Sequence, residues 1–218
     1  QGDIDNLFLG SSTFRQGLDI YQIVEDMGES SYILSYNGNQ PVMEYLELKF
    51  LYERGVKIER LYVDLYPFTA SEDFKISDPK IFLETDIGFK RELTEMFAQE
   101  KKLTGILEMY VSANNELLLT WPATYTLIND RFYHGGSTEE TKALGEQELN
   151  KLGVPLDAVL NEQQMEYLSK IIDLAGKNNT EITFLEIPKY VTVYQKGAYC
   201  QTISDMEKWI TNKGAPCI

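Results

Sequence analysis

Residues 6–15, NLFLGSSTFR, decide the fold of this chain. An apolar run that ends in glycine and small polar residues is typical of a buried strand followed by a tight turn. In open α/β sheets such a turn lies at the carboxyl end of the strand, where these folds place their ligands. A serine in this turn lies beside free backbone N–H groups, which suits a nucleophile with an oxyanion hole. The alternative is that Ser11 and Ser12 only cap the helix that follows.

Beyond this stretch, strand and helix patterns alternate up to about residue 68. We expect strands at residues 4–9, 31–35 and 58–65, separated by helices at residues 17–27 and 41–54. Apolar residues recur at helical spacing in the helices, and the strands are short apolar runs bounded by turn residues. This order predicts a doubly wound, mostly parallel sheet.

The alternation stops after the third strand. Residues 69–162 contain mainly helical patterns and are too many for a plain crossover, so we expect a helical insertion packed over one end of the sheet. The α/β pattern then resumes, with a helix, a fourth strand at residues 181–187, another helix and the start of a fifth strand at residues 215–218. The sequence therefore predicts one α/β domain over residues 1–218. Its fold would be a three-layer α/β/α sandwich, flavodoxin-like, with a mostly parallel five-stranded sheet.

The composition excludes some classes of function. The 218 residues are 43% hydrophobic and 25% charged, as in folded proteins. A net charge of -14 argues against a nucleic-acid partner, whose phosphates would be repelled, and against electrostatic docking on an anionic membrane.

Metal and cofactor sites are also not expected. His134 is the single histidine, and Cys200 and Cys217 lie in no Cys-x-x-Cys pair, so we predict no metal site. The two cysteines either form one bridge or remain free thiols. No phosphate-binding loop or dinucleotide glycine pattern is present, so we predict no cofactor.

The two ends of the chain suggest processing. The chain opens at Gln1 without a start methionine, which favours an upstream targeting segment or membrane tether that is absent from this sequence. Because the last residues look like the start of a core strand, we expect the natural protein to continue beyond Ile218.

Three segments resemble the SGNH (GDSL-like) hydrolase superfamily. Residues 9–12, LGSS, are similar to its first block in the branch that has Gly-Ser-Ser in place of Gly-Asp-Ser. Residues 32–38, YILSYNG, resemble the second block, and residues 61–68, LYVDLYPF, resemble that branch's third strand with its acidic, Pro-Phe ending. The branch includes proteins of alginate O-acetylation and of teichoic-acid D-alanylation. The match covers residues 4–68 well and residues 181–218 only in outline.

The resemblance implies a serine esterase or O-acyltransferase. It would act on acyl esters, above all acetyl esters, of a small molecule, a carbohydrate or a cell-surface polymer, in an extracytoplasmic or membrane-associated location in a bacterium. The implied nucleophile is Ser12, and the implied oxyanion donors are the backbone N–H groups of Ser12 and Gly38. Asn39 would add a donor, although turn chemistry is the preferred interpretation of an asparagine beside a turn glycine.

Two departures from the family pattern matter. The third-block Gly-x-Asn-Asp is replaced by Asp64-Leu65-Tyr66-Pro67, and no Asp-x-x-His block lies within the 218 residues. Either that block follows Ile218, which we favour, or His134 serves as the base from its loop. These gaps also favour a second hypothesis, a catalytically inactive SGNH-like domain that binds polysaccharide or a partner protein. The sequence makes no prediction about the oligomeric state of the protein.

Overall fold

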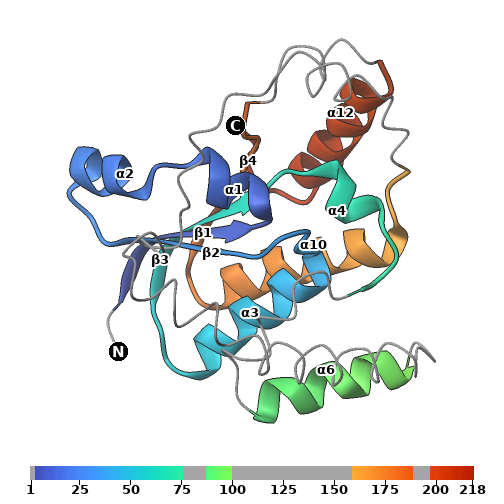
Figure 1. Cartoon of the computed structure of the whole chain (residues 1–218), viewed down its shortest axis with the longest axis horizontal. Helices are drawn as coiled ribbons and strands as arrows, with labels where there is room; N and C mark the ends of the chain where they lie inside the picture. The colour runs from blue at the N-terminus through green and yellow to red at the C-terminus, as the bar shows by residue number, and fades with distance from the viewer. Residues whose placement is uncertain (1–2, 76–86, 100–158, 189–196) are drawn as a thin grey trace, which may run out of the picture.

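The strands of this protein form one parallel sheet. A computed structural model describes residues 3–75, 87–99, 159–188 and 197–218. Within these ranges the chain is an α/β protein with a four-stranded sheet in the order β2-β1-β3-β4 (Figure 1). The strands are β1 (Ile4–Gly10), β2 (Ser31–Ser35), β3 (Ile58–Asp64) and β4 (Glu181–Leu185). The predicted parallel α/β fold is thereby confirmed.

The described helices connect and cover these strands. They are α1 (Ser12–Gly17), α2 (Ile20–Met27), α3 (Pro41–Glu53), α4 (Pro67–Ser71), α6 (Ile87–Gln99), α10 (Glu162–Lys177) and α12 (Gly197–Asn212). None of the helices in the described ranges combines the length and the apolar composition needed to cross a membrane.

The helix predicted at residues 17–27 is α2, and an additional short helix, α1, precedes it. The first, α1, begins at Ser12, and Leu18 then adopts extended backbone with φ -116°. Asp19 starts α2, because its carboxylate accepts hydrogen bonds from the backbone N–H groups of Tyr21 and Gln22, at 3.0 and 3.2 Å. A side chain that caps a new helix in this way separates it from the preceding one.

The predicted fifth strand is not formed as a strand. Residues 215–218 run beside β4 but make a single parallel bridge, between Phe184 and Cys217. The backbone N–H of Phe184 donates to Pro216 O at 2.8 Å, and that of Ile218 donates to Phe184 O at 2.9 Å. Pro216 has no N–H to donate, which limits the ladder at this point. Of the predicted insertion, α4 and α6 are helical, and residues 76–86 and 100–158 lie outside the described residues.

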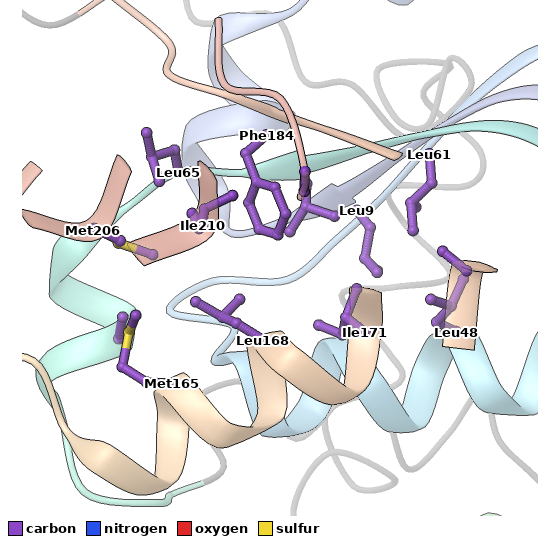
Figure 2. Close-up of a cluster of buried hydrophobic side chains, with 14 of the residues drawn as sticks. Leu9, Leu48, Leu61, Leu65, Met165, Leu168, Ile171, Phe184, Met206 and Ile210 are labelled. Carbon is purple, nitrogen blue, oxygen red and sulfur yellow. The ribbon is translucent and has the colours of Figure 1, made fainter. Parts of the chain in front are cut away.

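Both faces of the sheet are buried. Leu7 and Leu9 of β1 belong to a large cluster with α10 and α12, whereas Phe8 between them packs with Phe14 and Ile20 on the other face. Figure 2 shows Leu9 in the large cluster, together with side chains of β3, β4 and α10. This two-sided burial explains the continuous apolar runs at residues 7–9 of β1 and 61–63 of β3.

The strand order places a topological switch point between β1 and β3. The chain leaves β1 into α1 and α2, which pack with Phe8 on one face, and leaves β2 into α3, which packs on the opposite face beside α10 (Figure 1). In open α/β sheets the crevice at such a point, outside the carboxyl ends of the strands, is where ligands bind. Here the serine turn follows β1, and Asp64 ends β3.

Gly10 is required where β1 passes Asp64. A Cβ atom at position 10 would lie 2.4 Å from the Cβ of Asp64 and 3.2 Å from Cδ2 of Phe14. The first contact is too short for any side chain, and Cβ of Asp64 moves only with its backbone. The strand end therefore accepts glycine alone.

We expect Gly10→Ala to lower the free energy of unfolding by about 1–3 kcal/mol, the usual cost of overpacking a core. The matched control is Gly176→Ala in α10, where a Cβ would have no neighbour within 4 Å. That change should raise stability by about 0.5–1 kcal/mol, because alanine is the better helix former. Urea unfolding of both variants measures the difference, and equal stabilities would contradict the packing argument.

Candidate functional site

Ser11 caps the helix that follows the first strand. It has extended backbone at φ -93° and ψ -169°, and its Oγ accepts a hydrogen bond from the backbone N–H of Thr13 at 3.3 Å. Its side chain is fully buried. The expectation that a serine of this turn acts as a helix cap is confirmed for Ser11.

Asp64 holds the serine turn from the neighbouring strand. Its Oδ2 accepts hydrogen bonds from the backbone N–H of Ser11 at 3.2 Å, from the Ser11 hydroxyl at 2.6 Å and from the Thr13 hydroxyl. The pairing of Leu9 with Val63 brings the ends of β1 and β3 together at this point. Sequence reasoning noted Asp64 as the acidic residue at the end of the third strand and as a departure from the third block, but not as a partner of the serine turn. The signal that would have found it is the shared carboxyl edge of two parallel strands.

Ser12 differs from Ser11 in its burial and in its hydrogen bonding. It is the first residue of α1 and is half-buried. Within the described part of the chain, its hydroxyl makes no hydrogen bond. Its backbone N–H belongs to the first turn of the helix, where N–H groups have no intrahelical acceptor. Ser12 therefore offers a free hydroxyl and a free donor at the same point.

The turn after β2 lies against the serine turn. The backbone N–H of Tyr36 donates to the carbonyl oxygen of Gly10 at 3.3 Å. Two residues further, Gly38 has φ +62°, a left-handed conformation that favours glycine. The two segments that carry the predicted oxyanion donors, Ser12 and Gly38, are thus joined by a backbone hydrogen bond.

Asn39 is held by α3. Its side chain is buried, and its Nδ2 donates to both carboxylate oxygens of Glu47, at 3.2 and 3.0 Å. This contact supports the interpretation of Asn39 as a residue that fixes the turn, and through the turn the position of Gly38. A direct contact of Asn39 with substrate stays a prediction.

A buried carboxyl group with no hydrogen-bond partner lies in the same region. Glu44 of α3 is 2% exposed, and its Oε2 has no partner among the described residues. Burial, followed by the charges of Asp64 and Glu47, raises the pKa of Glu44 well above its usual value. Burial, with the charges of Asp64 and Glu72, also raises the pKa of Tyr66 to about 12. Sequence reasoning missed Glu44, because an isolated acid in a helix is usually exposed.

No base for Ser12 is present among the described residues. His134, the single histidine, lies outside them. Within the described ranges, no cluster of three or more His, Cys, Asp or Glu side chains is arranged to hold a metal ion. Cys200 is exposed and Cys217 is half-buried, and no disulfide joins the two in the structure.

Comparison with known proteins adds no family. A scan against protein-family models found no match, and a search of the curated proteins returned none either. The resemblance to the SGNH superfamily therefore rests on the three sequence segments alone, and the activity that it implies stays a prediction.

We predict that Glu44→Gln stabilises the protein in a pH-dependent way. A raised pKa in the folded state means that the stability contributed by the protonated carboxyl is fully present below about pH 4.5, its unfolded value, and is lost as the pH rises through the folded value. A glutamine keeps the neutral form at every pH. The variant should therefore be more stable than the wild type by about 1–3 kcal/mol at pH 8, and the difference should shrink towards pH 4.

Glu53→Gln is the control, because Glu53 lies on the same helix with an exposed side chain. Chemical unfolding at several pH values measures both variants. A stability difference for Glu44→Gln that does not vary with pH would show that Glu44 is an ordinary carboxylate.

Proposed function

We propose that this protein is an SGNH-like serine esterase or O-acyltransferase, with Ser12 as its nucleophile. Its substrate is an acyl ester, above all an acetyl ester, of a carbohydrate, a cell-surface polymer or a related small molecule. The observation that carries the proposal is the division between the two serines. Ser11 is buried and bonded to Asp64, whereas Ser12 presents a free hydroxyl at the switch point of the sheet. The finer fold that goes with this proposal is the three-layer α/β/α sandwich.

The proposed reaction follows the usual course of acyl transfer. Ser12 Oγ attacks the ester carbonyl carbon, and its proton passes to a base from outside the described residues. That base is either His134 or a histidine beyond Ile218. The backbone N–H groups of Ser12 and Gly38 receive the charge that develops on the carbonyl oxygen. The alcohol leaves with a proton, and the acyl group on Ser12 passes to water or to a sugar hydroxyl.

The surroundings of Ser12 support a preformed site. Asp64 fixes the turn through three hydrogen bonds, and the bond from Tyr36 to Gly10 holds the Gly38 segment beside it. A nucleophile on such a rigid support keeps its geometry without reorganisation, which is the main source of electrostatic catalysis.

A binding domain without catalysis is the second candidate. It is favoured by two features of the sequence: no Asp-x-x-His block lies within the 218 residues, and Asp64-Leu65-Tyr66-Pro67 replaces the third-block Gly-x-Asn-Asp. A serine hydroxyl without a base is a poor nucleophile. In this case the same crevice would hold polysaccharide or a partner protein without turning it over.

Ser12→Ala and Ser11→Ala form a matched pair that separates these roles. We expect Ser12→Ala to abolish labelling by a fluorophosphonate probe and ester turnover, with a change in stability within about 0.5 kcal/mol. Ser11→Ala should lose about 1–3 kcal/mol of stability, because it removes a helix cap and one of the three hydrogen bonds that Asp64 Oδ2 accepts. Intact mass and thermal unfolding report the two effects.

Two results would count against the enzyme. An adduct that persists in Ser12→Ala would remove Ser12 from the mechanism. No adduct in the wild type, and none in a chain extended past Ile218, would favour the binding domain.

A further inference from the structure

Arg15 is a buried cation beside the candidate nucleophile. Its side chain is on α1, three residues after Ser12, and only 8% of the residue is exposed. Its Nη2 donates to Oδ1 of Asn37, and its Nε is buried with no hydrogen-bond partner among the described residues. No ion pair joins Arg15 to any carboxylate in the described ranges.

A charge in this position is unusual. An arginine keeps its charge at any physiological pH, and burying a charge without an opposite one is unfavourable. The buried carboxylates nearby take their hydrogen bonds elsewhere: Asp64 from the serine turn, and Glu47 from Asn39. The structure therefore contains a guanidinium whose charge calls for an anion that the described residues do not supply.

The location of Arg15 points to the substrate. Residues three apart on a helix lie on the same face, so Arg15 and Ser12 are neighbours. Asn37 is exposed and directly precedes Gly38. The contact between Arg15 and Asn37 thus bridges the two segments that carry the proposed oxyanion donors, and it ends at a residue that solvent reaches.

We infer that Arg15, with Asn37, forms a subsite for an anionic substituent of the substrate, a phosphate or a carboxylate, next to the ester that Ser12 attacks. The inference rests on the proposed function. A guanidinium presents a planar set of N–H donors that matches the paired oxygens of either anion. The net charge of -14 repels anionic molecules from most of the surface, so a local cation is needed where such a substrate binds. The ester substrate is then a charged one, and its charge sets its orientation.

Anion binding tests the subsite without requiring turnover. Inorganic phosphate and acetate are titrated separately into the wild type and into Arg15→Gln, and binding is followed by ligand-observed NMR. We expect the wild type to bind at least one of the two, and Arg15→Gln to weaken that binding about tenfold or more, the value of one charge-assisted hydrogen bond. The preferred anion shows whether the substituent is a phosphate or a carboxylate.

Three variants make the result interpretable. Arg91→Gln removes the same charge from an exposed side chain of α6 and should bind as the wild type does. Arg15→Lys keeps the charge but not the planar donors and should bind with intermediate affinity, which covers the case in which Arg15→Gln fails to fold. Ser12→Ala should retain binding. Equal binding by Arg15→Gln and wild type, or binding of neither anion by the wild type, would overturn the subsite.

Turnover gives an independent arm. The value of kcat/KM is measured for an anionic ester (an acetylated sugar phosphate or acetylated uronate) and for a neutral acetylated sugar. The ratio of the anionic to the neutral value should fall about tenfold or more in Arg15→Gln and stay constant in Arg91→Gln. Turnover that depends on Ser12 but shows no change in this ratio would refute the subsite alone. Anion binding that depends on Arg15, without turnover by this chain or by a chain extended past Ile218, would refute the enzyme and leave the subsite standing.

Discussion

The Oδ2 atom of Asp64 accepts three hydrogen bonds from the turn after β1, and the geometry of the candidate site depends on this contact. It joins the carboxyl ends of the two central strands, and it requires Gly10, because any Cβ there would meet Asp64. A buried carboxylate that accepts several donors is well stabilised. The first role of the Gly-Ser-Ser segment is therefore structural. Gly10 leaves room for Asp64, and Ser11 donates hydrogen bonds to it. Ser12, in contrast, makes no side-chain hydrogen bond within the described ranges.

The three buried acids around this contact differ in their hydrogen-bond partners. Asp64 and Glu47 each accept hydrogen bonds from the turns that they fix. Oε2 of Glu44 has no hydrogen-bond donor in the described ranges. Burial and the negative charges of Asp64 and Glu47 disfavour the ionised form of Glu44, so the neutral form is favoured. Groups with perturbed pKa values gather at functional sites more often than elsewhere. Here the group with the raised pKa is Glu44 of α3, on the helix whose Glu47 fixes the turn before it. This position indicates support of the site and not proton transfer.

Periodicity and turn residues were enough to predict the strands and helices up to residue 68, because both signals are local. The separate helix α1 was not predicted, because its six residues are too few to show a helical pattern of apolar residues. Asp64, Glu44 and Arg15 could not be predicted, since their contacts come from strand register and helix packing. Residue type alone also could not separate Ser11 from Ser12. That separation came first from a family resemblance, and the structure gives it a physical cause in the N-cap geometry of Ser11.

The same geometry limits where a base for Ser12 can come from. Oδ2 of Asp64 accepts hydrogen bonds from Ser11 and Thr13, and the loss of these bonds would free the turn that carries Ser12. Glu47 is committed to Asn39 in the same way. In the proposed reaction these two carboxylates therefore hold the turns, and the base, His134 or a histidine beyond Ile218, comes from outside the described residues. Arg15 is on that serine's helix, so a substrate held by its charge would be placed before the base is engaged.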